Sequence, residues 1–209
     1  MGSWSVADLS KFHRRAQAHR GLNESNEGMD LRSMQAFGAE WVNSRFSGCK
    51  MGLADMRNVR LTETVLIGCS AYASNFLGAT LRSCDIAETD FEQSVFSGSV
   101  IEDVVFTQCR FSFSTFAGAT LKGKVRFLGC DFRGADLDFL ESENVEFDGC
   151  NMWGIRVNFG CSFWNSRFDR KTVQMFAGLL ARLDDDPRLV EYAGDRLPLL
   201  KRVMDRGEK

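Results

Sequence analysis

Apolar residues recur every five positions through the middle of the chain. In steps of five from Leu31 to Leu121, all 19 positions are apolar. Because apolar residues make up 44% of the chain, chance agreement is on the order of 10⁻⁷. Neither the 3.6-residue period of an α-helix nor the two-residue period of a strand produces this spacing. The pattern therefore predicts a repeated five-residue unit.

A second position in each unit is restricted to small or β-branched residues. It lies two residues before each apolar centre, from Ala39 to Ala119. Residues i and i−2 of an extended segment point to the same side, so each unit directs one large and one small side chain inward. Gly recurs two residues after the centre, as at Gly48, Gly68 and Gly98. We expect the chain to turn a corner there, because Gly tolerates the backbone angles of a tight turn.

The spacing of one small residue indicates four sides per coil. This residue is cysteine, at Cys49, Cys69, Cys109, Cys130 and Cys150. A coil of four five-residue sides places these thiols in one column, and Phe76, Phe96 and Phe116 in another. The register slips by one residue within 122–126 and again before Phe163, as a bulge or corner loop would allow.

These features predict an all-β solenoid, and several segments resemble a known family. The best match is Cys130-Asp131-Phe132-Arg133-Gly134-Ala135-Asp136-Leu137, followed by 76–81 and 116–121. They are similar to the repeats of the pentapeptide-repeat family, which read roughly Ala-(Asp/Asn)-Leu-X-X. The resemblance implies a right-handed quadrilateral β-helix. We expect seven coils over residues 30–168, roughly 34 Å long at a strand spacing of about 4.8 Å.

The ends of the chain lose the five-residue period and carry helical patterns. We expect a helical cap in residues 1–29, where Ser5 and Asp8 have capping-box spacing, and a helical segment in residues 169–209. One side of the latter is apolar, with Val173, Phe176, Leu179, Leu180 and Leu183. The quinolone-resistance branch of the family ends in a helical segment that forms a head-to-head dimer. The resemblance thus implies a homodimer through Phe176, Leu179, Leu180 and Leu183, with capping of the last coil as the alternative.

Residue types that carry catalysis or bind metals are scarce. The two histidines, His13 and His19, lie near the N-terminus without a catalytic arrangement around them. All seven cysteines occupy the small inward position, where a free thiol acts as a small buried hydrophobe. The paired CxxC spacing of a zinc site is absent. We therefore expect no catalytic residue, metal or cofactor, and the chain is predicted not to be an enzyme.

Overall charge limits the classes of partner. The chain has 26 Lys and Arg against 28 Asp and Glu, without the basic excess of a nucleic-acid-binding protein. No apolar run approaches the roughly 18–20 residues of a membrane span. Charged residues such as Asp8 and Lys11 stand where a signal peptide would be apolar. We expect a cytoplasmic protein with reduced thiols that binds neither nucleic acid directly nor a membrane.

Acidic residues are unevenly distributed along the repeats. Between Ser83 and Cys109 there are six acids and no Lys or Arg, namely Asp85, Glu88, Asp90, Glu92, Glu102 and Asp103. The five-residue period places Asp85 and Glu88 on one side of the coil, with Asp90 and Glu92 on the next. We predict that these six acids bind a partner protein, and the alternative is an ordinary solvated surface.

The resemblance also suggests a function. Some members of the family bind DNA gyrase by imitating the charge and rod shape of DNA. A 34 Å length of B-DNA carries roughly 20 negative charges, whereas residues 30–168 contain 17 acids and 13 bases. Imitation by the whole surface is therefore poor, but a local acidic stripe remains compatible with the idea. The first hypothesis is a resistance protein that binds gyrase or another topoisomerase, and the alternative is an immunity protein or scaffold that neutralises a partner such as a toxin.

Overall fold

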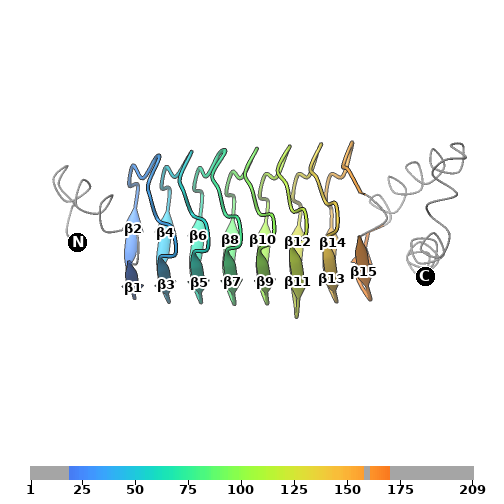
Figure 1. Cartoon of the computed structure of the whole chain (residues 1–209), viewed down its shortest axis with the longest axis horizontal. Helices are drawn as coiled ribbons and strands as arrows, with labels where there is room; N and C mark the ends of the chain where they lie inside the picture. Colours follow the sequence, from blue (N-terminus) through green and yellow to red (C-terminus); the bar gives the residue numbers. More distant parts are fainter. Residues whose placement is uncertain (1–18, 158–160, 170–209) are drawn as a thin grey trace, which may run out of the picture.

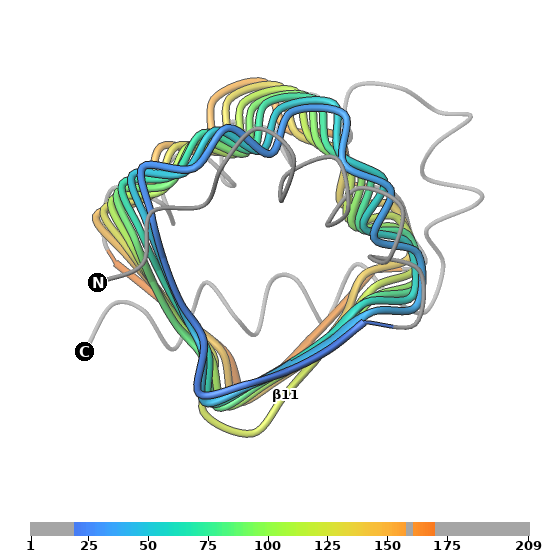
Figure 2. The ribbon, with the colours of Figure 1, turned by 90° about the vertical axis from the view of Figure 1, so that its left-hand side faces the viewer.

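The computed structural model describes residues 19–157 and 161–169, which form a straight rod of stacked coils (Figure 1). Viewed along the rod, each coil has four sides (Figure 2). All strand pairs are parallel, and the described residues contain no helix. Each of two sheets has eight strands, one from every coil, so the chain completes seven full turns between the first strand and the last. The predicted all-β solenoid of seven coils is confirmed.

Two sides of the coil are continuous parallel sheets. Face I consists of β1 (Arg20–Leu22), β3 (Glu40–Val42), β5 (Arg60–Thr62), β7 (Thr80–Arg82), β9 (Val100–Glu102), β11 (Thr120–Lys122), β13 (Glu141–Glu143) and β15 (Ser162–Trp164). Face II consists of β2 (Ser25–Glu27), β4 (Arg45–Ser47), β6 (Val65–Ile67), β8 (Asp85–Ala87), β10 (Val105–Thr107), β12 (Arg126–Leu128), β14 (Glu146–Asp148) and β16 (Arg167–Phe168).

The other two sides are held by single bridges between successive coils. The bridges of face III join Asp30, Lys50, Ser70, Asp90, Arg110, Asp131 and Asn151. The bridges of face IV join Gln35, Asp55, Asn75, Val95, Thr115, Asp136 and Arg156. Coils are numbered here from the one that begins at β1, so Val95 lies in coil 4.

The register is constant through the first coils and changes at the predicted slips. Phe106 pairs with Ile86 of the preceding coil and with Phe127 of the following coil, so the second interval along the chain is longer by one residue. The extra residue lies between β11 and β12, where Gly123 and Lys124 form the loop that protrudes beside β11 in Figure 2. Ser142 and Phe163 likewise pair across the longer interval. A one-residue insertion is absorbed at a corner, since each straight side has no room for an additional residue.

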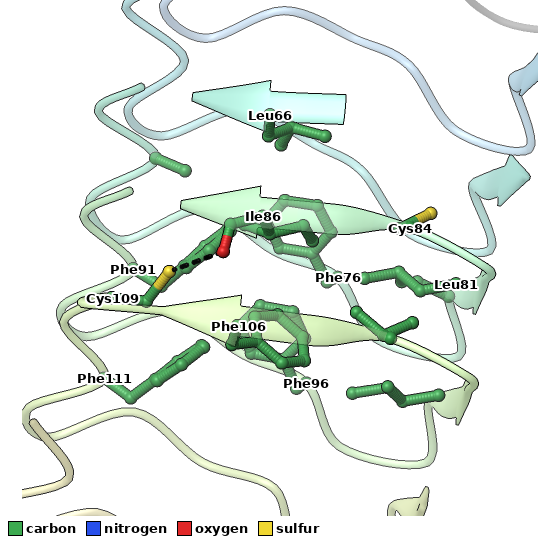
Figure 3. Packing of buried hydrophobic residues seen from close by; sticks show 14 of the residues in the cluster. Leu66, Phe76, Leu81, Cys84, Ile86, Phe91, Phe96, Phe106, Cys109 and Phe111 are labelled. Atoms are coloured by element: carbon green, nitrogen blue, oxygen red, sulfur yellow. Dashed lines mark hydrogen bonds between the residues drawn. The ribbon is translucent and has the colours of Figure 1, made fainter. Parts of the chain in front are cut away.

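The interior contains ordered columns of Phe (Figure 3). On face IV the Phe96 ring stacks on Phe76 at a centroid distance of 4.8 Å and on Phe116 at 4.9 Å. Neighbouring columns meet edge to face, as Phe91 and Phe96 do at 5.3 Å. Because the ring spacing matches the strand spacing of about 4.8 Å, Phe residues of successive coils stack on one another in the middle of the rod.

Small polar residues fill many of the remaining inward positions, and most of them hydrogen-bond to the backbone. Ser74 Oγ donates to the Met51 carbonyl at 2.6 Å, and Ser94 Oγ donates to the Ala71 carbonyl at 2.7 Å. The Cys109 thiol contacts the Ile86 carbonyl in the same way, at 3.4 Å. These bonds offset the cost of burying a polar group. They also explain why Ser, Thr and Cys alternate with Ala at this position.

The β-helix begins at Arg20, inside the segment 1–29 that the sequence pattern assigns to an N-terminal cap. The first two sides of this coil lack the apolar signature, because Gly21 and Asn26 occupy their inward centres. A Cβ at Gly21 would lie 2.4 Å from Cδ1 of Trp41, so this coil needs Gly to accommodate the large ring of the next. The expected helices before residue 19 and after residue 169 lie outside the described residues.

Candidate partner-binding surface

The six acids predicted to bind a partner do not form one surface. Asp85 lies on β8 of face II, and Glu88 follows at the corner between faces II and III. Asp90 and Glu92 lie on face III of the same coil. Glu102 lies on β9 of face I, and Asp103 follows at the next corner. The structure thus brings four of the six together and places the other two on a different side of the rod.

Basic residues from neighbouring coils approach three of these six acids. The Arg110 guanidinium, one coil beyond Asp90, forms ion pairs with Glu92 and, at 3.7 Å, with Asp90. Glu102 lies between Arg82 at 3.1 Å and Lys122 at 3.5 Å.

Asp103 has a backbone partner, since its Oδ1 accepts a hydrogen bond from the Lys124 amide at 2.8 Å. No Lys or Arg lies between Ser83 and Cys109 in the sequence, but basic residues of neighbouring coils lie close to this segment in the structure. The parallel register places residues of successive coils within ion-pairing distance.

Similar pairs cover much of the rod. Some join adjacent coils, such as Arg20 with Glu40 at 2.8 Å. Others join residues two apart, as Arg32 does with Asp30, and the hydrogen bond from Arg32 holds the pKa of the exposed Asp30 carboxyl at about 2. Exposed ion pairs contribute little to stability, because water and salt screen them. The main consequence of this pairing is a surface with little net charge.

One acidic cluster is neutralised only in part, by Arg110, and we call it the acidic corner: Asp85, Glu88, Asp90 and Glu92. Within the described residues Asp85 and Glu88 are exposed and form no ion pair. On faces II and III of coils 3 to 5, Arg110 is the single basic residue. Half-buried apolar residues flank Asp85 along face II, including Val65, Ile67 and Val105. The corner is thus a local excess of negative charge in uncharged surroundings.

A second surface feature was not predicted from the sequence. Leu53, Phe113 and Phe139 occupy corner positions with φ of 59°, 57° and 57°, and their exposed fractions are 64%, 65% and 60%. A left-handed backbone costs roughly 1–2 kcal/mol for a residue with a side chain, and burial does not repay that cost here. Trp153 and Tyr72 lie near the same corner of face III as Leu53 and Phe113. A bulky apolar residue at the position that usually holds Gly or Asn was the sequence signal.

Five thiols occupy the predicted interior column, namely Cys49, Cys69, Cys109, Cys130 and Cys150. Six of the seven cysteines are buried, and Cys161 is half-buried. Burial raises the pKa of the Cys84 thiol to about 11, and the neighbouring Cys109 thiol is the first cause that raises the pKa of Cys130 to about 12. The thiols of Cys84 and Cys130 therefore stay protonated and unreactive near neutral pH. Within the described residues, no group of three or more His, Cys, Asp or Glu side chains is arranged to hold a metal ion.

Two other sets of predicted residues receive no structural test. The dimerisation residues Phe176, Leu179, Leu180 and Leu183 lie outside the described part of the chain, as does His13. His19 is described, and its Nε2 lies 2.9 Å from Glu24 Oε1. In the part of the chain that the structure describes, no helix is long and apolar enough to span a membrane.

A parallel four-sided solenoid of five-residue units, with one large and one small inward residue in each, defines a class of repeat protein. The chain belongs to the pentapeptide-repeat family. The family model, described as pentapeptide repeats, matches in eight copies, which include residues 60–98, 74–112 and 84–123. No curated protein matches the chain by sequence.

Several solved structures are similar to the chain. A trypsin-treated variant of QnrB1, described as a plasmid-mediated fluoroquinolone resistance protein, has 15% identity and a TM-score of 0.39, covering 80% of this chain and 92% of its own. HetL, a pentapeptide-repeat protein involved in heterocyst differentiation regulation in the cyanobacterium Nostoc sp. strain PCC 7120, has 14% identity and a TM-score of 0.35, covering 78% and 94%. Rfr23 of the cyanobacterium Cyanothece 51142 has 12% identity and a TM-score of 0.29, covering 76% and 98%. None of these similarities identifies a partner for the present chain.

Proposed function

We propose that this protein is a non-enzymatic binding protein that contacts a basic surface of another protein through the acidic corner. The observation that carries the proposal is the convergence of Asp85, Glu88, Asp90 and Glu92 in coil 4, where Arg110 is the single basic residue on faces II and III of coils 3 to 5. Complementary charge steers association and selects the partner more than it adds affinity. The proposal replaces the six-residue stripe with a four-residue corner, because Glu102 and Asp103 lie on another side with partners of their own.

The corner is held rigidly, which favours binding without rearrangement. The Glu88 amide donates to the Thr107 carbonyl at 2.8 Å, and the Asp90 amide donates to the Cys69 carbonyl at 2.9 Å. Asp90 Oδ1 also accepts from the Glu92 amide at 3.0 Å, which fixes the turn that follows. Carboxylates on a preorganised backbone lose less conformational entropy on binding than those on a mobile loop.

A single basic patch is a better partner than a long DNA-binding groove. B-DNA carries a charge about every 1.7 Å along its axis, but most acids along this rod are paired with an arginine or lysine of the same chain. Within the described residues, unpaired exposed acids lie in separate patches, such as Asp85 and Glu88 in coil 4 and Glu141 and Glu143 on face I. Imitation of DNA, if it operates, is therefore local.

The partner that the family resemblance suggests is DNA gyrase or another topoisomerase, which the protein would regulate or protect as a resistance protein. The test uses purified gyrase with the wild type, with Asp85→Lys/Glu88→Lys, and with Glu141→Lys/Glu143→Lys. The last variant is a matched control, because Glu141 and Glu143 are exposed acids on face I and form no ion pair within the described residues. The wild type and control should alter supercoiling or sensitivity to a gyrase poison, whereas the corner variant should not, and added salt should weaken the effect.

A second candidate is an immunity protein or scaffold that neutralises a different partner such as a toxin. The exposed Phe113 and Trp153 favour it, because aromatic residues are enriched in protein–protein interfaces. This candidate is preferred if the wild type leaves gyrase unaffected and a pull-down recovers another protein that the corner variant fails to bind. If the corner variant binds every partner as the wild type does, the acidic corner is an ordinary solvated surface and the proposal fails.

A further inference from the structure

Five of the six buried thiols form the column on face III, and all five have the same orientation. Each Sγ atom contacts a carbonyl oxygen of the preceding coil and the carbonyl oxygen two residues earlier in its own coil. For Cys109 these oxygens are that of Ile86 at 3.4 Å (Figure 3) and that of Thr107 at 3.5 Å. In the other four thiols of the column the corresponding distances are 3.3–3.7 Å. The thiols therefore point in the same direction in every coil that has one.

This shared orientation fixes the distance between sulfur atoms of adjacent coils. Because successive coils are one strand spacing apart, the Sγ atoms of Cys49 and Cys69 are separated by about 4.8 Å along the rod. Cys130 has two such neighbours, Cys109 in the preceding coil and Cys150 in the following one. The proximity of the thiols also affects their ionisation, since Cys69, as a hydrogen-bond donor, is the first cause that lowers the pKa of Cys49 to about 7.

The spacing of the thiols matches the span of two metal–sulfur bonds. A bond from a metal ion to a thiolate is about 2.3 Å long, so two such bonds in a line span about 4.6 Å. A disulfide requires Cβ atoms about 3.5–4.5 Å apart, whereas the Cβ atoms of this column are separated by a full strand spacing of about 4.8 Å. The column therefore suits one metal ion between two thiolates better than it suits a disulfide.

The surroundings of the column restrict the kind of ion. Zinc prefers four ligands, but within the described residues no group of three or more His, Cys, Asp or Glu side chains is arranged to hold an ion. Apolar side chains such as Phe91 and Phe111 occupy the adjacent interior. Two thiolates with a divalent ion are neutral together, whereas two thiolates with a monovalent ion leave a negative charge in this interior, which is costly. A soft divalent ion with two ligands in a line meets both requirements.

We propose that the thiol column binds soft divalent metal ions in linear coordination, such as the mercuric ion. One ion joins Cys49 to Cys69, and a second joins Cys130 to either Cys109 or Cys150. Each ion forms two metal–sulfur bonds and releases to solvent the protons that the two thiols hold, so that no oxidant or reductant is required. Because each ion links two coils of the folded rod, it also stabilises the folded chain. The site lies inside the rod and does not depend on the acidic corner.

Two variants with equal numbers of thiols test the pairing. Cys69→Ser/Cys130→Ser leaves no two thiols of the column in adjacent coils, and is called the unpaired variant. Cys84→Ser/Cys161→Ser removes two thiols outside the column and keeps every pair, and is called the paired variant. Serine suits these inward positions, because Thr89 of the same column donates to a backbone carbonyl at 2.9 Å.

Both full-length variants are refolded with mercuric chloride, which gives the ion access to the interior, and excess glutathione then removes ions held by a single thiol. After gel filtration the paired variant should retain two mercury ions per chain. The unpaired variant should retain at least about fivefold less, because it cannot offer a second thiol at high effective concentration. Mercury should raise the Tm of the paired variant and leave that of the unpaired variant unchanged. Equal retention, or retention in the paired variant without a rise in Tm, overturns the proposal.

A gain of binding tests the geometry without removing any thiol. Thr89 interrupts the column between Cys69 and Cys109, so Thr89→Cys completes six successive thiols in three pairs. The retained mercury should rise from two ions per chain to three. Ser94→Cys is the matched control, because it adds a thiol at a buried inward position of face IV that has no cysteine in the adjacent coils, and its count should stay at two. A count of two for Thr89→Cys, or an equal rise for Ser94→Cys, also overturns the proposal.

Discussion

Phe96 and Phe113 belong to adjacent coils, but Phe96 lies inside the β-helix and Phe113 lies on its outer surface. Phe96 is fully buried between Phe76 and Phe116 at an inward centre. Phe113 is 65% exposed, at a corner with φ of 57°. The inward position is apolar in every coil of face IV and holds a ring in three successive coils, where each ring stacks on its neighbours about 4.8 Å away. The outward corner has no such requirement. A residue that strains the backbone there, such as Phe113, is available for contact with another molecule.

The largest difference between the two positions should appear in stability. Phe96→Ala leaves a cavity in the middle of a stacked column and should lower the free energy of unfolding by about 3–5 kcal/mol. Phe113→Ala, the same substitution on the outside, should lower it by less than about 1 kcal/mol. Denaturant unfolding of both variants measures the difference, and equal losses would show that the assigned register is wrong.

Thiol reactivity compares the inside with the edge of the rod. Cys161 is half-buried, whereas the other six cysteines are buried. A maleimide should modify Cys161 at least about tenfold faster than any other thiol of the native protein, and denaturation should expose all seven. Mass spectrometry of a labelling time course identifies the modified residues. Fast labelling of Cys109 or Cys130 would contradict the closed interior.

The cost of the left-handed corner can be measured at Phe113. Phe113→Gly removes the steric cost of the positive φ, whereas Phe113→Ala keeps it, so the Gly variant should be the more stable of the two by about 1 kcal/mol. Thermal unfolding of the two variants isolates this backbone contribution. A more stable Ala variant would mean that residue 113 leaves the left-handed conformation.

The smallest expected effect on stability is that of the ion pairs on the outer surface of the rod. The hydrogen bond from Arg57 lowers the pKa of Asp55 below its ordinary value of 3.8. A folded-state pKa below the unfolded value stabilises the protein above about pH 4, and this contribution is lost as the pH falls through the folded-state pKa. Asp55→Asn should therefore destabilise by less than about 1 kcal/mol at neutral pH and by less at pH 3. Asp85→Asn, which removes an acid without an ion pair, should be close to neutral at pH 7, and a larger loss there than for Asp55→Asn would contradict the pairing.

The candidate site was predictable only in part. The period placed Asp85 and Glu88 on one side and Asp90 and Glu92 on the next, as the structure has them. The same period also implied that Arg110 would lie one coil beyond Asp90. Along the chain these acids have no Lys or Arg nearby, so sequence proximity alone does not indicate their ion pairs with residues of neighbouring coils. In a parallel solenoid the electrostatic neighbours of a residue lie a full coil away along the chain.

The sequence by itself determined the five-residue unit, the four sides, the thiol and Phe columns and the slip within residues 122–126. These features repeat at every coil, so each is specified many times by the same inward requirement for one large and one small side chain. The tertiary structure alone decided where the first coil starts, which acids are neutralised, and that Leu53, Leu77 and Phe113 are exposed. Those properties depend on contacts between coils at single positions, and a periodic pattern does not specify contacts that occur only once.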